Sequence, residues 1–105
     1  MNEKARLQQL EKRIDRIKQD LAAVGDMRPG SLTRQYKDPA NKRGPFYQLS
    51  YTRDKKSRTE YVSRDRVVAL RREIAAYKRF KALTTEWISL SIERSRLKMK
   101  LASMI

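Results

Sequence analysis

The stretch GPFYQLSYTRDKKSRTEYV, Gly44 to Val62, contains two runs of alternating β-type residues around a charged tip. Alternate residues of a strand share one face, so the pattern predicts a β-hairpin with tyrosines turned to the core. The positions expected to share that face are Tyr47, Leu49, Tyr51, Ser57, Thr59 and Tyr61. The tip falls among Arg53–Lys56, which lacks an Asn-Gly or Asp-Gly pair, so the register of the hairpin stays open.

Two strands alone are unstable in water, so a third strand or a helix must cover them. The preceding residues 25–45 hold all three Gly and all three Pro of the chain, which excludes a helix there. Within them SLTRQY, residues 31–36, alternates in the same way and predicts a third strand.

Helices are predicted on both sides of this region. In residues 3–24 apolar side chains recur in steps of three and four, which is typical of heptad a and d positions, and Gly25 is the expected C-cap. These apolar residues are Leu7, Leu10, Ile14, Ile17, Leu21 and Val24. Two interpretations remain open: the stripe packs inside its own chain, or it joins two copies.

Ser63 is a good helix N-cap, and the run from Arg64 is predicted to be helical nearly to the C-terminus. This helix is longer than the first, so part of its apolar stripe lacks cover. Either the helix folds back at Thr84, or a second chain supplies the missing surface. The expected oligomer interface, consistent with a homodimer, is Leu7, Leu10, Ile14, Ile17, Leu21, Trp87, Leu90, Leu97 and Leu101.

Together these patterns predict an α+β fold that is mostly α, with long helices in a coiled-coil-like arrangement. The helices flank a small antiparallel β-hairpin or three-stranded sheet. The predicted segments are an N-terminal heptad helix at 1–25, a basic loop and hairpin at 26–63, and a long helix or helical pair at 64–105.

The composition excludes several classes of catalytic and metal site. The chain has no Cys and no His, so thiolate nucleophiles, cysteine zinc sites and the usual general base are excluded. No paired carboxylates, Gly-rich phosphate loop or nucleophile elbow appears either, and we expect no enzyme, no cofactor and no metal. The charged N-terminus has no apolar core and no stretch is long enough to span a membrane, which predicts a cytoplasmic protein with no membrane partner.

Twenty-six Lys and Arg against twelve Asp and Glu give a net charge of +14, which indicates an acidic partner. Nucleic acid is the commonest polyanion in a cell, with DNA favoured over RNA here. The candidate nucleic-acid-binding residues are Arg28, Arg34, Lys42, Arg43, Arg53, Lys55, Lys56, Arg58, Arg71, Arg72, Lys78 and Arg79. The alternative is a solubilising surface with an edge strand protected by Lys. A bound ribbon would enter the DNA major groove, or its aromatic residues would stack on unpaired bases.

Several blocks of the sequence resemble a family of small uncharacterised prokaryotic proteins. They are MRPGSLTRQY at 27–36, GPFYQLSYTR at 44–53, the K-x-R-T-x-Y-V pattern at 56–62 and RREIAAYKRFKALTTEWISL at 71–90. Genes of that family often lie near transposases, so the resemblance implies a mobile genetic element but no established activity. Many relatives carry a Cys-rich insertion after the equivalent of Tyr36, which this chain lacks, and no zinc is expected.

The sequence thus predicts a nucleic-acid-binding accessory protein of a mobile element, in which a basic loop and hairpin on a coiled-coil platform grip backbone phosphates. The alternative is a non-enzymatic adaptor whose coiled-coil surfaces bind an acidic partner protein, for example a transposase.

Overall fold

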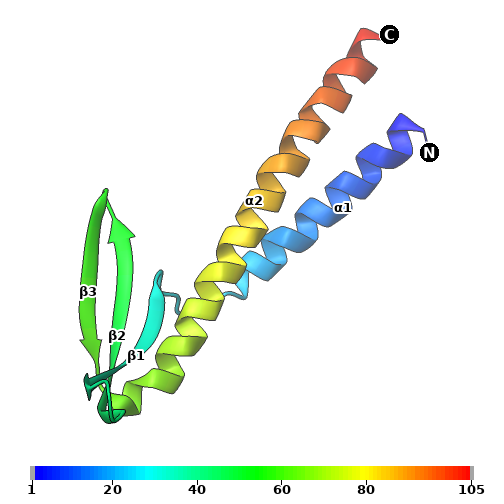
Figure 1. Ribbon diagram of the computed structural model, residues 1–105. Coiled ribbons are helices and arrows are strands. Elements are labelled where there is room, and N and C mark those ends of the chain that lie inside the picture. The colour runs from blue at the N-terminus through cyan, green and yellow to red at the C-terminus, as the bar shows by residue number, and fades with distance from the viewer. Residues whose placement is uncertain (1, 105) are drawn as a thin grey trace. The chain divides into compact units, whose positions relative to one another are not determined.

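A computed structural model of the protein describes residues 2–104. The elements in chain order are α1 (Glu3–Ala22), β1 (Ser31–Asp38), β2 (Arg43–Arg53), β3 (Lys56–Val62), a 3₁₀ turn η1 (Arg64–Arg66) and α2 (Val67–Ser103) (Figure 1). The predicted α+β, mostly α class is confirmed, with a three-stranded antiparallel sheet rather than a lone hairpin.

The described chain divides into two compact units. One, the helical pair, consists of α1 and the part of α2 from Arg79 onward. The other, the sheet unit, spans residues 25–78 and contains the sheet and the start of α2. The predicted segments 1–25, 26–63 and 64–105 are therefore regrouped, because α2 contributes to both units.

Helix α1 begins and ends with different capping devices. The side chain of Asn2 accepts a hydrogen bond from the Ala5 N–H at 2.8 Å, which satisfies one free donor of the first turn. At the other end the Ala23 N–H still donates to the Gln19 carbonyl at 3.2 Å, and Ala23 keeps right-handed helical angles. The expected glycine C-cap is thus wrong, since α1 ends at Ala22 and Gly25 has no left-handed conformation.

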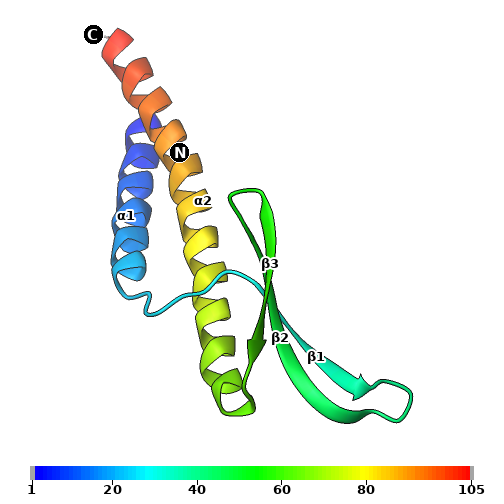
Figure 2. The same ribbon diagram turned by 90° about the vertical axis from the view of Figure 1, so that its left-hand side faces the viewer.

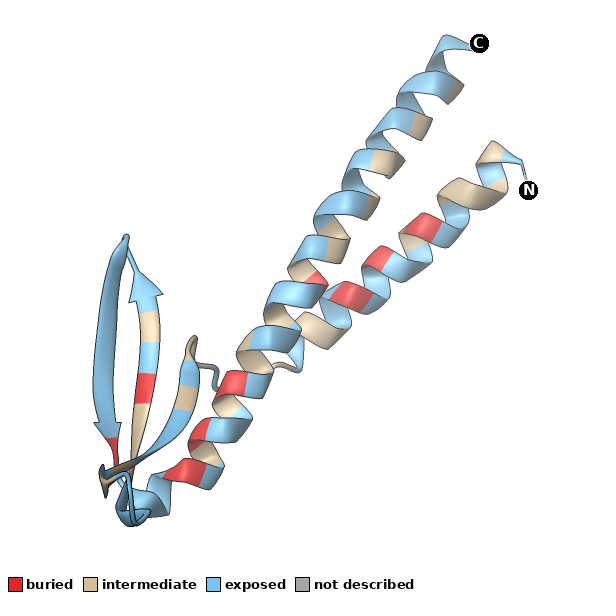
Figure 3. Cartoon of the chain, in the orientation of Figure 1, coloured by how far each residue is buried: buried red, intermediate tan, exposed pale blue. Residues whose placement is uncertain are grey.

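Within the helical pair, α1 runs antiparallel to the C-terminal part of α2 (Figure 1). Ion pairs fix this direction by joining early residues of α1 to late residues of α2: Glu3 with Lys100, Arg6 with Glu93 at 2.8 Å, and Arg13 with Glu86 at 2.6 Å. The a and d side chains of α1 lie between the helices, and Leu10 and Ile17 are 1% and 0% exposed. Figure 3 shows these buried positions along one side of α1. The heptad stripe therefore packs inside its own chain.

Helix α2 is continuous across Thr84. The hydroxyl of Thr84 donates to the carbonyls of Phe80 and Lys81, each at 3.0 Å, so it bonds to the preceding turn instead of opening it. At about 1.5 Å per residue, the 37-residue helix is about 55 Å long. The predicted alternative of a helix that folds back near Thr84 is wrong. The predicted start at Arg64 is early by three residues, since Arg64–Arg66 forms η1 and the α-helix begins at Val67.

The sheet has the order β1-β2-β3 with both pairs antiparallel. Arg53 pairs with Lys56, so Asp54 and Lys55 form a two-residue turn, and both have positive φ, 52° and 64°. Two residues with positive φ make the type I′ geometry that matches the twist of a hairpin. Asp54 and Lys55 adopt this turn without glycine, which is why the sequence left the register open.

This register corrects one predicted face. Tyr47 lies opposite Val62 and Leu49 opposite Glu60, whereas Tyr61 lies opposite Gln48. Residues opposite each other share a face, so Ser57, Thr59 and Tyr61 point away from the side of Tyr47, Leu49 and Tyr51. The predicted match was displaced by one residue, and such a slip exchanges the two faces of a strand.

The core of the sheet unit lies between the sheet and the first turns of α2. Its buried residues are Leu49, Val62, Val67, Leu70 and Ile74, against which Leu32, Tyr47 and Tyr51 pack. Among residues 2–104, no helix has both the length and the apolar character needed to cross a membrane.

Candidate nucleic-acid interface

Ten of the twelve predicted nucleic-acid-binding residues make no ion pair with a carboxylate in the described chain. They are Arg34, Lys42, Arg43, Arg53, Lys55, Lys56, Arg58, Arg71, Arg72 and Lys78, and all are exposed. An unpaired exposed cation keeps its full charge toward solvent and toward an approaching anion. All ten belong to the sheet unit.

Arg28 is the clearest exception. Its guanidinium donates to Glu60 at 2.7 Å and lies over the ring of Tyr51, 4.9 Å from the centroid, while its N–H donates to the Glu73 carbonyl on α2 at 3.0 Å. Tyr51 also donates its hydroxyl to Glu60 at 3.0 Å. These contacts attach the chain before β1 to both β3 and α2. The predicted phosphate-binding role of Arg28 is therefore replaced by a structural one.

The same contacts shift the pKa values of the charged residues in this cluster. The hydrogen bond from Arg28, and after it that from Tyr51, lowers the pKa of the Glu60 carboxyl below its ordinary value. The hydrogen bond to Glu60 in turn raises the pKa of Arg28. Both groups thus stay charged at neutral pH and hold each other in place.

Two further predicted residues are also engaged. Arg34 lies over the ring of Tyr36, 5.3 Å from its centroid, which leaves its donors in water but fixes its position. Arg79 belongs to the helical pair, where it reaches the Asp20 carboxylate at 3.9 Å. Arg79 was predicted to share one basic surface with Lys78, but its charge is partly neutralised by Asp20.

Basic residues gather at both ends of the sheet. The β1–β2 turn carries Lys42 and Arg43, and the β2–β3 turn carries Arg53, Lys55 and Lys56. In an antiparallel sheet of three strands these turns lie at opposite ends, as Figure 2 shows. A chain of phosphates along the sheet would therefore meet cations at each end.

A hollow of about 330 Å³ lies where β1 begins beside α2 within the sheet unit. Its walls include Gly30, Ser31 and Leu32 on one side and Arg71, Ile74 and Lys78 on the other. Arg71 and Lys78 are one heptad apart, so both point from the same side of α2. The structure thus joins two of the predicted basic residues at one concave site.

Sequence reasoning missed the sheet surface turned away from α2, here called the outer face. Its members alternate with the core-facing residues and are Ser31, Thr33, Gln35, Lys37, Phe46, Gln48, Ser50, Thr52, Ser57, Thr59 and Tyr61. Of these eleven only Lys37, at the end of β1, is charged, in a chain in which 36% of residues are. The alternation of Ser, Thr and Gln was visible in the sequence, but the displaced hairpin register hid that the three strands share it.

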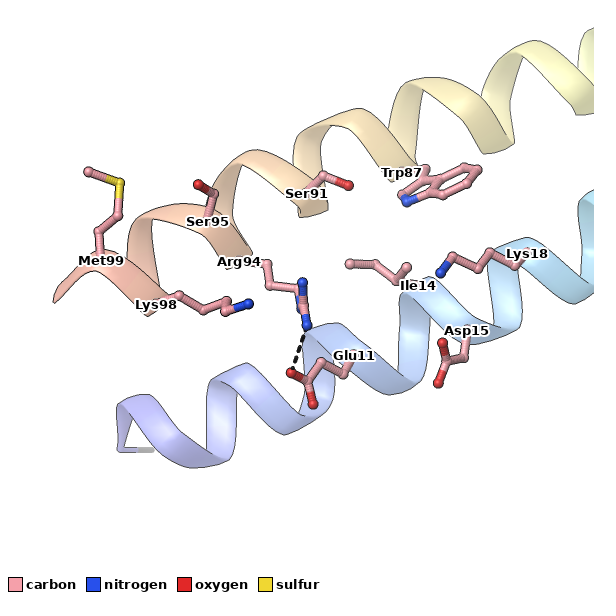
Figure 4. Close-up of a pocket in the computed structure, with 10 residues that line it drawn as sticks. All are labelled: Glu11, Ile14, Asp15, Lys18, Trp87, Ser91, Arg94, Ser95, Lys98 and Met99. Carbon is pink, nitrogen blue, oxygen red and sulfur yellow. Dashed lines mark hydrogen bonds and ion pairs between the residues drawn. The ribbon is translucent and has the colours of Figure 1, made fainter. Parts of the chain in front are cut away.

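The helical pair has a groove of about 420 Å³ of its own. Figure 4 shows Trp87 beside Lys18, whose ammonium lies 5.6 Å from the ring centroid, and Arg94 bonded to Glu11 at 3.2 Å. Ser91 and Ser95 lie on the part of α2 that lines the groove, and their small side chains leave it open.

The predicted oligomer interface divides in the structure. Leu10, Ile14 and Ile17 are buried within the single chain, so they are not available to a second copy. The other predicted residues are half-buried: Leu7, Leu21, Trp87, Leu90, Leu97 and Leu101. The most exposed apolar residues of this part of α2 are instead Ile88, Ile92 and Met99, which the heptad analysis did not select.

Among residues 2–104, no group of three or more acidic side chains is arranged to hold a metal ion. No buried side-chain nitrogen or oxygen in this part lacks a hydrogen-bond partner either.

A family model, described as "Domain of unknown function (DUF6788)", matches residues 7–72. The chain belongs to this family. The matched region takes in most of α1, the whole sheet and the first turns of α2. No curated protein and no solved structure matches the chain.

Proposed function

We propose that the protein binds nucleic acid without catalysing a reaction, by holding backbone phosphates on the basic residues of the sheet unit. The observation that carries the proposal is the set of ten predicted cations on one unit that have no carboxylate partner among the described residues. The resemblance noted in the sequence adds the setting of an accessory protein of a mobile genetic element. We place its action in the cytoplasm, with DNA as the preferred partner.

The distribution of ion pairs supports this proposal more than the net charge does. In the helical pair, five of six carboxylates are paired with Arg or Lys of the same unit. The sheet unit has fourteen basic and six acidic residues, and only Glu60 and Glu73 form ion pairs there. A surface needed only for solubility would mix both signs. The sheet unit leaves twelve of its fourteen basic residues without a carboxylate partner in the part of the chain that the structure describes, whereas six of the twelve in the helical pair form ion pairs. This larger excess of cations fits a polyanion better.

The two turns and the hollow have separate roles in this proposal. Lys55, Lys56 and Arg58 on the β2–β3 hairpin hold consecutive phosphates, since exposed Lys and Arg bind them without reading sequence. Arg71 and Lys78 hold one further phosphate at the hollow beside Gly30, where the backbone approaches closely. Contacts of this kind position a strand or duplex and give little base specificity.

The test compares two double variants with the same change of charge. Lys55→Ala/Lys56→Ala removes two cations from the hairpin turn, and Lys4→Ala/Lys12→Ala removes two exposed lysines from α1. Binding to a labelled DNA duplex is measured by fluorescence anisotropy over a series of salt concentrations. We expect the hairpin variant to reduce the slope of log affinity against log salt by about 1.8, because each phosphate contact contributes roughly 0.9.

The α1 variant should leave the slope nearly unchanged. Equal slopes for both variants would show that net charge alone attracts the DNA and would remove the hairpin from the site. Absence of binding by the wild-type chain to DNA and RNA at low salt would overturn the proposed function itself.

A second candidate function is protein binding through the helical pair, and one observation favours it. Ile88, Ile92 and Met99 project from α2 with exposed fractions of 62%, 49% and 70%, beside Ser91 and Ser95. Apolar side chains repeated along one helix side are typical of a surface that packs on another helix.

The occupant that fits this surface is a second copy of the chain. The groove has an unpaired carboxylate on α1, Asp15, and an unpaired ammonium on α2, Lys98. Asp15 and Lys98 give this surface charges of both signs, which is the complementarity that two copies related by a two-fold axis need. A partner protein such as a transposase is the alternative outcome of the same test, described below.

A further inference from the structure

The outer face of the sheet takes no part in the phosphate binding proposed above. Its single charged side chain, Lys37 at the end of β1, contributes little to the attraction of a polyanion. A solvent-facing strand surface in so charged a chain would ordinarily contain Lys, Glu or Arg, which protect it from pairing and aggregation. The lack of charge on the rest of the face therefore needs another explanation.

Two aromatic side chains lie on this face. Tyr61 is 73% exposed, and Phe46 is half-buried. Tyr61 lies opposite Gln48, and Phe46 is two residues before Gln48 on the same strand, so the two rings form a diagonal pair. Such pairs have Cβ atoms about 7–8 Å apart, which leaves each ring accessible to a planar partner.

The remaining side chains are hydrogen-bonding groups with unused capacity. In the described chain, the hydroxyls of Ser50, Thr52, Ser57 and Thr59 form no hydrogen bond, and the Gln48 amide forms none. Gln35 donates to Thr33 at 3.3 Å and Thr33 to the Gln48 carbonyl at 3.4 Å, both long contacts. Amide and hydroxyl groups both donate and accept, so they can bond to the edges of any base.

The structure also leaves this face open. Core residues of the sheet unit lie on the opposite side, and nine of the eleven outer-face residues are exposed. The basic turns with Lys42 and Lys55 lie at its two ends. Rings and hydrogen-bonding groups at the centre with cations at the ends match the needs of a single strand, whose bases are splayed out while its phosphates run alongside.

We propose that the outer face is a stacking platform for single-stranded nucleic acid, with Tyr61 and Phe46 each accepting one base. This inference rests on the proposed function and specifies the form of nucleic acid. In a duplex the bases are already stacked and the flat faces of their rings are not accessible, so the platform would have no role there.

The test uses a fluorescently labelled oligo(dT) strand and a duplex with the same number of phosphates. Tyr61→Ser removes the ring, Tyr61→Phe keeps it, and Val68→Ser is the matched control, since Val68 is a similarly exposed apolar residue (63%) of the same unit but not of the sheet. We expect Tyr61→Ser to weaken binding of oligo(dT) about tenfold, with the salt slope unchanged because no charge is lost. Tyr61→Phe and Val68→Ser should bind as the wild type does.

A second readout is the NMR signal of the rings. Stacking on a base should shift the ring protons of Tyr61 and Phe46 upfield with oligo(dT) but not with the duplex. If the wild type binds both forms, but Tyr61→Ser binds oligo(dT) normally and the ring signals do not move, this inference is overturned while the proposed function stands. If neither form binds, both fail.

Discussion

At the scale of single residues, the path of the chain before β1 depends on one glycine that allows two backbone segments to approach closely. Gly30 has φ of 138°, and a Cβ placed there would lie 2.7 Å from Leu49 Cδ1 and 2.9 Å from the Ser50 carbonyl oxygen. Leu49 is a central core residue, 1% exposed. The start of β1 can therefore approach β2 only because residue 30 has no side chain.

Gly30→Ala should lower the free energy of unfolding by about 2–3 kcal/mol, since it adds both backbone strain and a core clash. Gly25→Ala is the matched control, because nothing lies within 4 Å of its added Cβ and its φ is not positive. Urea unfolding followed by circular dichroism measures both variants. Equal effects of the two substitutions would contradict the described path of the chain before β1.

The Arg28–Glu60–Tyr51 cluster makes a prediction about pH. The lowered pKa of Glu60 in the folded chain means that its contribution to stability is complete above the pKa of an unfolded Glu, about 4.3, and is lost as pH falls through the folded value. Carbon-13 NMR titration of the Glu side chains should find the pKa of Glu60 below the ordinary value. Arg28→Gln should raise it more than Tyr51→Phe does, because the bond from Arg28 is the larger cause.

At the scale of elements, each helix is stabilised by its neighbour rather than by its own composition. The central a and d side chains of α1, Leu10, Ile14 and Ile17, are buried against α2, and cross-helix ion pairs such as Arg13–Glu86 at 2.6 Å lie along the edges. Exposed ion pairs contribute little to stability, so the buried stripe supplies most of the packing energy. The ion pairs fix direction and alignment instead.

Ile17→Ala should therefore destabilise the helical pair by about 2–5 kcal/mol, the usual cost of removing a buried Ile side chain. Ile88→Ala removes the same atoms from a residue that is 62% exposed, and in the monomer it should cost under about half a kcal/mol. Thermal unfolding at low protein concentration compares the two. A small effect of Ile17→Ala would mean that α1 does not pack on α2 as described.

At the scale of the whole molecule, the two units differ in how they use charge. The helical pair neutralises most of its carboxylates within itself and leaves an apolar side of α2 exposed. The sheet unit leaves most of its cations unpaired, and its outer face has a single charged residue, Lys37. The first arrangement fits self-association, and the second fits nucleic acid.

Self-association through the helical pair predicts a dimer at micromolar concentration by multi-angle light scattering. Ile88→Asp should shift the population to monomer, because a carboxylate in the centre of an apolar interface is left without a partner. Val68→Asp, an equally exposed position of the other unit, should leave the dimer intact. A wild-type monomer at high micromolar concentration would exclude the second copy and leave another protein as the partner of this surface.

The sequence alone determined the elements and their types, because heptad spacing, strand alternation and clustered Gly and Pro act locally. The spacing of Leu10, Ile14 and Ile17 predicts a helix whatever these residues pack against. The alternation in SLTRQY predicts a strand even when the strands that pair with it are unknown. The basic candidates of the sheet unit were also visible as charges, since charge is a property of the residue itself.

Only the tertiary structure decided which surfaces these residues share. The two-residue turn at Asp54 and Lys55, both with positive φ, sets the register that places Tyr61 on the outer face. The local sequence did not predict that turn, because it contains no glycine or asparagine. Likewise, Glu60, 32 residues away in the chain, forms the ion pair that removes Arg28 from the basic surface, and α2 covers the apolar stripe of α1. Pairing across long separations depends on which segments approach in three dimensions, and one residue of shift in a strand exchanges its two faces.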